Sequence, residues 1–163
     1  MLAKDIFHQL VITALENEGW TISHNPYRID LGFVDFYIDL GAEKLIAATK
    51  DGEKIAVEIK TFLAASTISE FHIAVGQFIN YRIALEEQES ERRLYLAVPL
   101  EIYKRFFKYP FIQTVISRTQ IPLIIYDVEK EVISVISYQL SVISTYGFSH
   151  RLEIMNQIFF SSP

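Results

Sequence analysis

The sequence contains no cysteine, which excludes disulfide bonds and thiolate metal sites. A small secreted scaffold is therefore not expected, and a reducing cytoplasm suits the chain. No apolar run is long enough to span a bilayer, so we expect no membrane-spanning helix. We expect no export signal either, because Asp5 interrupts the apolar stretch that such a signal needs near the N-terminus.

Several catalytic motifs are also missing. The sequence has no glycine-rich phosphate loop, which disfavours nucleotide hydrolysis, and no G-x-S-x-G elbow. Its four histidines do not match a metal-binding spacing such as H-E-x-x-H. The formal net charge of −5 disfavours a protein that coats nucleic acid by bulk electrostatics, because neutralising phosphates requires clustered lysine and arginine. A local basic groove around an acidic, metal-binding centre remains compatible with that charge.

The sequence is rich in hydrophobic residues. Half of its 163 residues are hydrophobic, which is typical of one folded domain and not of a disordered chain. We place this domain at residues 1–133. Residues 134–163 form a separate tail that begins with a near-repeat, SVISYQL followed by SVISTYG. This tail is either an appended segment or includes an ordinary edge strand, and the sequence favours neither.

Periodicity and turn residues predict the elements of the first part. They are a helix over 5–18, a strand over 20–24, a strand over 33–40 and a hairpin over 44–60. Gly19 ends the helix, and Asn25-Pro26 marks a turn. Asp51-Gly52 between two apolar runs is the strongest hairpin signal.

The pattern of the chain from Thr67 onward predicts a crossover connection between two strands. Thr67 and Glu70 have the spacing of a capping box, which starts a long helix that continues to about residue 87. The remaining elements are a solvated connection at 86–93, a strand over 93–98, short helices after Pro99 and over 111–118, and a strand over 121–127. A strand, helices and a strand imply a crossover within one sheet. The fold class is therefore α/β, a mixed sheet with helices against it.

The sharpest chemical feature is the run Glu58-Ile59-Lys60. In a strand, Glu58 and Lys60 project to one face, while Ile55, Val57 and Ile59 project to the core. We therefore expect a half-buried strand that presents a carboxylate beside an ammonium group. Asp39 lies on the polar side of the preceding predicted strand. Neighbouring strands are about 4.8 Å apart, so Asp39 and Glu58 can share one cation if their strands are adjacent.

Two neighbouring carboxylates repel each other unless a cation lies between them. Mg²⁺ accepts one or two protein carboxylates, keeps several waters, and can polarise a phosphate and help to generate hydroxide. Lys60 would orient the attacking water or stabilise charge on the phosphorus oxygens. We expect Asp39, Glu58 and Lys60 to meet in a solvent-accessible pocket. E-x-K also occurs by chance, and Glu58 and Lys60 would then be an exposed ion pair of little energetic value.

The long predicted helix adds Gln77 and Tyr81, which share one face because they are four residues apart. Gln77 could bind a metal water or a DNA backbone group, with Tyr81 holding it in place. The alternative is a core tyrosine beside an incidental glutamine. Further along the chain, Arg92-Arg93 and the basic residues within 104–108 could contact phosphates, although charge clusters are usually solvated faces.

An aspartate, E-x-K on the next strand and a helix with Q-x-x-x-Y resemble the PD-(D/E)XK nuclease superfamily. The segments AKDIFHQLV, GWTISHNPY, YIDLGAEKLIAA, EKIAVEIKTF, VGQFINYR and ERRLYLAVP resemble the XisH family, the excision-controlling factor of the fdxN element, over about residues 3–130. This resemblance implies a restriction-endonuclease-like mixed β-sheet flanked by helices. It also implies Asp39 and Glu58 as Mg²⁺ ligands, Lys60 as the catalytic lysine and Gln77 as the helix glutamine. Glu16 is a further candidate carboxylate.

The resemblance implies partners as well. They are an XisI-like companion protein, DNA and a site-specific recombinase, and self-association stays open. Three functions fit these expectations. The chain is a Mg²⁺-dependent nuclease-fold protein in programmed DNA excision, a catalytically silent regulatory subunit that docks the companion, or a nuclease that the companion restrains.

Overall fold

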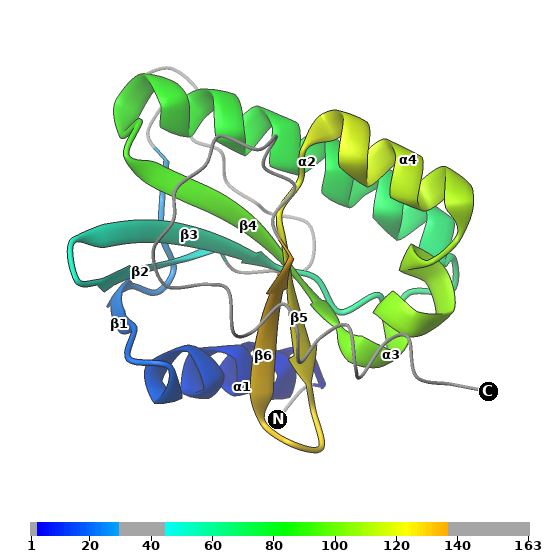
Figure 1. Cartoon of the computed structure of the whole chain (residues 1–163), viewed down its shortest axis with the longest axis horizontal. Coiled ribbons are helices and arrows are strands. Elements are labelled where there is room, and N and C mark those ends of the chain that lie inside the picture. Colours follow the sequence, from blue (N-terminus) through cyan, green and yellow to red (C-terminus); the bar gives the residue numbers. More distant parts are fainter. Residues whose placement is uncertain (1–2, 30–44, 137–163) are drawn as a thin grey trace, which may run out of the picture.

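The computed structural model describes residues 3–29 and 45–136, which form a six-stranded sheet with helices on both faces (Figure 1). The sheet order is β1-β2-β3-β4-β5-β6. The strands are β1 Thr21–His24, β2 Leu45–Lys50, β3 Glu53–Ile59, β4 Arg92–Pro99, β5 Leu123–Asp127 and β6 Val132–Ile136. The helices are α1 Ala3–Asn17, α2 Thr67–Gln88, α3 Leu100–Ile102 with the π-helix Tyr103–Phe107 that continues it, and α4 Pro110–Thr119. The predicted mixed α/β fold is confirmed.

The centre of the sheet is parallel and its edges are antiparallel. β3 pairs parallel with β4, and β4 pairs parallel with β5. The β4-to-β5 connection runs through α3, the π-helix and α4, so the predicted crossover is confirmed. β1, β2 and β6 add to the two sides in antiparallel pairs.

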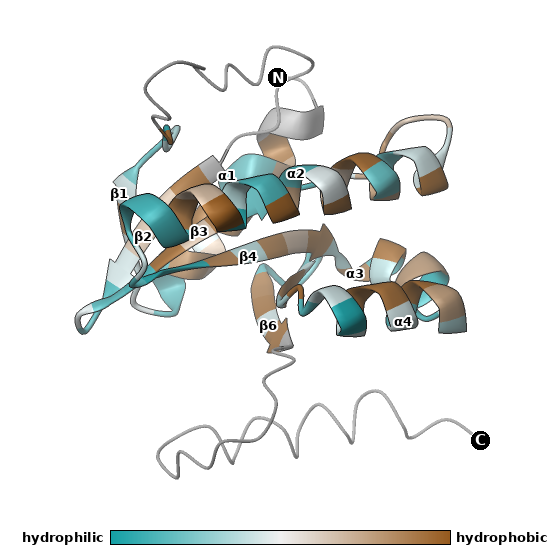
Figure 2. Ribbon diagram, turned by 90° about the horizontal axis from the view of Figure 1, so that it is seen from above, coloured by the Kyte–Doolittle hydropathy of each residue, from teal (hydrophilic) through white to brown (hydrophobic). Residues whose placement is uncertain are grey.

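The β2–β3 hairpin forms where the sequence predicts it. Asp51 and Gly52 both have positive φ, 49° and 83°, which is the requirement of a type I′ turn that matches the twist of the strands. Figure 2 shows polar residues at this tip and apolar ones along the central strands. Polar tip residues keep the hairpin in water while its strands join the core.

Each face of the sheet has its own core. The face toward α1 contains buried residues of that helix and of the strands: Val11, Leu15, Ile46, Ile55, Val57, Ile59, Ile124 and Tyr126. The opposite face packs against α2 and α4 through Phe71, Phe78, Ala56, Leu94, Leu96, Ile112, Ile116 and Leu123. Residues 55–60 are therefore covered on both sides. The expectation of a half-buried strand is wrong, because alternation identifies the residues that share a face but not what covers that face.

The N-terminus of α2 differs by one residue from the prediction. Ser66 is the N-cap, and its hydroxyl accepts a hydrogen bond from Ser69 N at 3.4 Å. Glu70 Oε2 accepts from Ala64 N at 3.1 Å, which satisfies an amide of the loop. The predicted Thr67 cap is wrong, because a neighbouring serine competes equally well for this position.

β6 is an edge strand that pairs antiparallel with β5. Residues 134–136 therefore belong to the sheet, as the edge-strand alternative requires. The predicted strand over 33–40 and the tail from residue 137 lie outside the described residues. Within the described ranges, no helix is long and apolar enough to cross a membrane.

The predicted solvated connection after α2 contains a charged cluster instead. Arg92, 7% exposed, donates from Nε to Glu89 Oε2 at 2.7 Å and from Nη2 to Glu89 Oε1 at 3.1 Å. Its Nη1 donates to Ile55 O at 2.9 Å, and its guanidinium lies 4.9 Å from the Tyr27 ring centroid. Tyr27 and Lys54 also donate to Glu89. Arg92 thus ties the end of α2 to the sheet, and this arrangement leaves it no role as a phosphate contact.

This cluster predicts a pH-dependent stability. Hydrogen bonds from Arg92 lower the pKa of Glu89 to about 2. A carboxylate with a lowered folded pKa stabilises the fold above its unfolded pKa, and that contribution is lost as the pH falls. Glu89→Gln should lower the free energy of unfolding on the order of 1 to 2 kcal/mol at pH 7, allowing for solvent screening. The difference from wild type should shrink between about pH 5 and pH 2.

Urea unfolding at a series of pH values measures this. Glu91→Gln is the control, because the Glu91 side chain is 81% exposed and lies 3.9 Å from Lys54. We expect that variant to stay within about 0.5 kcal/mol of wild type. A Glu89→Gln deficit that stays constant across the acid range would contradict the assignment.

Candidate functional site

Lys60 lies between a carboxylate and an amide beneath α2. Its Nζ is 3.3 Å from Glu58 Oε1 and donates a hydrogen bond to Gln77 Oε1 at 2.6 Å. Glu58 and Lys60 are 3% and 5% exposed, and Gln77 is half-buried. The structure thus brings together three of the four predicted site residues, two from the end of β3 and one from α2.

The backbone of Lys60 is held by two further strands. Lys60 N donates to Ala97 O at 2.9 Å, which extends the parallel pairing of β3 with β4 by one residue. The hydroxyl of Tyr126 on β5, a fully buried residue, donates to Lys60 O at 3.4 Å. The sequence showed residues 121–127 only as an apolar strand. The contact between Tyr126 and Lys60 has no local signal, because the two residues meet only through the sheet order.

The chain turns under strain directly after this position. Phe62 has φ 55°, which a non-glycine residue adopts at a cost of about 1 to 2 kcal/mol. Its ring is buried and packs edge-on against Phe107, with ring centroids 5.5 Å apart. The preceding Thr61 is buried, and its Oγ1 has no hydrogen-bond partner among the described residues. Strain and an unsatisfied polar atom are both features that concentrate at functional sites.

Stability alone does not explain why the ion pair of Glu58 and Lys60 is buried. Removing two charges from water costs several kcal/mol per ion, and apolar residues of similar volume are often as stable or more so. The prediction that Glu58 and Lys60 line a solvent-accessible pocket is wrong for these two side chains, because this face of β3 is buried against α2. Of the three residues, Gln77 keeps the largest exposure.

A divalent cation fits this donor set in part. Among the described residues, no group of three or more His, Cys, Asp or Glu side chains could hold a metal ion. Glu58 offers a hard carboxylate oxygen of the kind that Mg²⁺ prefers, and Mg²⁺ needs only one or two such ligands. Asp39, the second predicted ligand, lies outside the described residues. Leu45, which follows it by six residues in the sequence, pairs with Glu58 across β2 and β3.

Tyr81 and Glu16 are the two remaining site candidates from the sequence, and the structure agrees with the interpretation of only one of them. Tyr81 is 3% exposed and belongs to the core between α2 and the sheet, in agreement with its interpretation as a core aromatic. Glu16 is exposed on α1. Because α1 and α2 cover opposite faces of the sheet (Figure 1), Glu16 is separated from Lys60 by the sheet itself. Its assignment as an extra site carboxylate is wrong.

Comparison with known proteins gives a consistent answer. A family model described as XisH protein matches residues 1–134. The crystal structure of an XisH family protein from Nostoc punctiforme PCC 73102 is 53% identical, with a TM-score of 0.74, and the match covers 80% of this chain and 97% of that chain. The crystal structure of an fdxN element excision controlling factor protein from Anabaena variabilis is 51% identical, with a TM-score of 0.73, covering 80% and 96% respectively. No curated protein sequence matches this chain significantly.

The geometry predicts strong coupling between Glu58 and Lys60. Lys60→Met leaves a buried carboxylate without its counter-charge and should lower the free energy of unfolding by about 3 to 5 kcal/mol. Adding Glu58→Gln removes the stranded charge, so the double variant should be more stable than the sum of the single losses by about 1 to 3 kcal/mol. Urea unfolding of the four proteins measures this coupling.

The exposed pair Lys104 and Glu101, 3.4 Å apart, is the matched control. Its coupling should be at most about 0.5 kcal/mol, as for other exposed helical pairs. Additive losses at Glu58 and Lys60 would show that the two charges do not form a coupled buried pair.

Proposed function

This chain belongs to the XisH family, and from that membership we propose that it acts in the excision of a DNA element through a Mg²⁺-dependent nuclease centre. The centre consists of Asp39, Glu58, Lys60 and Gln77. The observation that carries the proposal is the buried contact of Lys60 with both Glu58 and Gln77, at 3.3 and 2.6 Å. A relative of known structure bears the description fdxN element excision controlling factor, which names the process.

Each described residue has a distinct part in this proposal. Glu58 supplies a carboxylate ligand, with Asp39 as the second. A Mg²⁺ ion bound there would polarise the scissile phosphate and acidify a water. The Lys60 ammonium stabilises negative charge that develops on the phosphate oxygens. Gln77 accepts a hydrogen bond from Lys60 and thereby fixes the position of its amine.

A second candidate function is a catalytically silent regulatory subunit. The near-complete burial of Glu58 and Lys60 favours it, because a nuclease has to bring a phosphate to these groups. In that case the same fold docks an XisI-like companion or the recombinase, and the buried pair only specifies the local structure. In either case we propose that the companion and the recombinase act with this chain on DNA.

Cleavage of DNA by the purified protein tests the first function. We expect plasmid cleavage with Mg²⁺ or Mn²⁺, alone or together with the XisI-like companion. Lys60→Met should reduce the rate by about 100-fold or more, the usual loss when one preorganised charge-stabilising group is removed. Gln77→Met should also reduce it while keeping every charge, which covers the case in which Lys60→Met fails to fold.

Lys54→Met is the matched control, because Lys54 lies on the same face of β3 at its other end, with a side chain 38% exposed. It should cleave within about twofold of wild type. Absence of cleavage under every condition, or cleavage that Lys60→Met leaves intact, would remove catalysis from the proposal. Normal excision by Lys60→Met in a reaction with recombinase and companion would favour the silent subunit.

A further inference from the structure

The corner between the π-helix and α4 exposes aromatic rings beside basic side chains. Tyr109 is 60% exposed and Phe111 is 67% exposed, more than any other large hydrophobic residue that the structure describes. Arg105 and Lys108, which lie four residues and one residue before Tyr109, are also exposed. We name these four residues the aromatic–basic corner. Exposed aromatic rings cost solvation free energy and in a folded protein often mark a binding surface.

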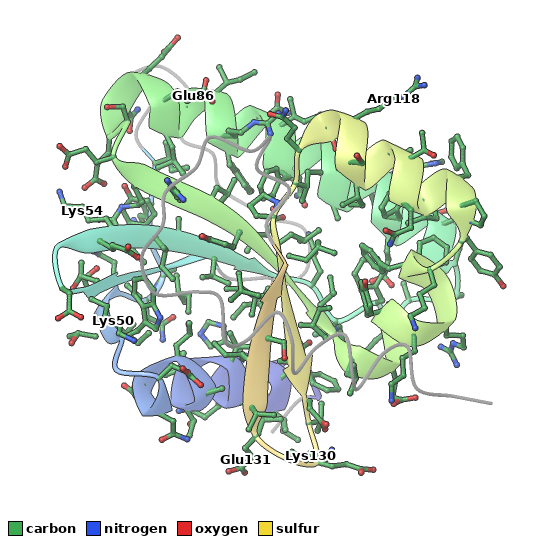
Figure 3. The ribbon with its side chains drawn as sticks, viewed as in Figure 1. Lys50, Lys54, Glu86, Arg118, Lys130 and Glu131 are labelled. Carbon is green, nitrogen blue, oxygen red and sulfur yellow. The ribbon has the colours of Figure 1, made fainter. Side chains whose placement is uncertain are left out.

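The chain segment that carries this corner is basic, and Glu101 and Asp127 lie just outside it. From residue 102 to residue 126 the sequence has four basic residues and no acidic one, while the formal net charge of the chain is −5. One of the four, Lys104, is 3.4 Å from Glu101. Another, Arg118, points outward near the far end of α4 (Figure 3). At the corner itself the basic side chains are Arg105 and Lys108, both exposed, and these two suit an anionic ligand.

The Tyr109 ring and the backbone that carries Phe111 are held by the structure around them. Tyr109 is the N-cap of α4, and Pro110 fixes the backbone between the two rings. The Tyr109 ring lies edge-on to Phe106 at 6.2 Å, and Phe106 lies edge-on to Phe71 at 5.6 Å. Because this packing holds the Tyr109 ring in place, a base that stacks on it loses little affinity to the ordering of that side chain.

The same aromatic packing connects the corner to the candidate site. The ring centroid of Phe107 is 5.7 Å from that of Phe71 and 5.5 Å from that of Phe62. Phe62 follows Lys60 by two residues. Figure 1 shows α3 beyond the carboxyl end of β4, at the same end of the sheet as the end of β3. A strand bound at the corner would therefore lie at the Lys60 end of the protein.

We infer that the aromatic–basic corner binds single-stranded DNA. Bases stack on Tyr109 and Phe111, and the phosphates between them lie beside Arg105 and Lys108. Stacking on aromatic side chains tolerates any base, and basic residues follow the backbone. A duplex keeps its base faces stacked inside and offers them to neither ring. The choice of DNA as occupant depends on the proposed function, whereas the stacking surface is independent of cleavage.

Fluorescence anisotropy with a labelled 20-nucleotide poly-dT, in EDTA to prevent cleavage, tests the inference. Wild type should bind this probe at least tenfold more tightly than a duplex of equal length. Phe111→Ser and Tyr109→Ser should each raise the Kd about tenfold, as loss of one stacking contact does. The double variant Arg105→Gln/Lys108→Gln should reduce the salt dependence of log Kd by about 1.4, at about 0.7 per phosphate contact.

Two control variants complete the experiment. Ile83→Ser removes an apolar residue of α2 that is 51% exposed, and Lys130→Gln removes a charge whose side chain is 75% exposed at the β5–β6 turn. Both should bind like wild type. Binding is measured in EDTA and needs no cleavage, so the inference and the proposed function can fail separately.

The contrary outcomes are equally clear. The inference is overturned by absence of binding, by equal affinity for duplex, or by a Kd that Phe111→Ser and Tyr109→Ser leave unchanged. Co-sedimentation with phosphatidylserine-containing vesicles that depends on the same residues, without binding of poly-dT, would assign the corner to a membrane surface instead.

Discussion

The buried contact between Glu58 and Lys60 is the constraint on which the account of this protein depends. Each charge alone would be costly beneath α2, and together they are tolerated because they lie 3.3 Å apart and Gln77 accepts a further hydrogen bond. The surrounding strands hold the backbone of Lys60 in position for this contact. β4 and β5 fix the backbone of Lys60 on both of its polar groups, and the strained turn at Phe62 directs the chain away directly after it.

One face of β3 carries charged residues with two different purposes. At the hairpin end, Lys54 joins Glu89 and Arg92 in a cluster that ties the end of α2 to the sheet. At the carboxyl end, Glu58 and Lys60 face α2 and find Gln77 there. The first cluster is partly exposed and stabilises the fold. The second is almost completely buried, and apolar residues of similar volume would stabilise the fold at least as well. That difference is the reason we propose the functional role for the second cluster.

Local sequence rules predicted what depends on neighbouring residues. The turn at Asp51-Gly52, the crossover between β4 and β5, and the shared face of Glu58 and Lys60 follow from turn chemistry and strand alternation. Gln77 came from its spacing on a helix, together with the family resemblance. The burial of Glu58 and Lys60 could not be predicted, because it depends on α2 packing over a strand that alternation alone left open.

The other differences between the sequence-based predictions and the structure arise from contacts between distant segments of the chain. The sequence predicts Arg92 in a solvated connection, but its partners Tyr27 and Ile55 come from distant segments. Glu16 shares no face with Lys60, because helix order along the chain does not say which side of a sheet a helix covers. The exposed rings of Tyr109 and Phe111 interrupt a segment whose other aromatic residues pack inward. Each outcome is a property of the assembled sheet and not of a local pattern.

Titration of the purified protein with Mn²⁺, followed by calorimetry, tests the central claim most directly. If Glu58 belongs to a metal-dependent centre, wild type binds Mn²⁺ at a saturable site that Glu58→Gln abolishes and that Asp39→Asn weakens. Glu91→Gln, an exposed carboxylate away from the pair, leaves the titration unchanged. Saturable binding that survives Glu58→Gln, or no saturable binding by wild type, would contradict the assignment of Glu58 and Lys60 to a catalytic centre.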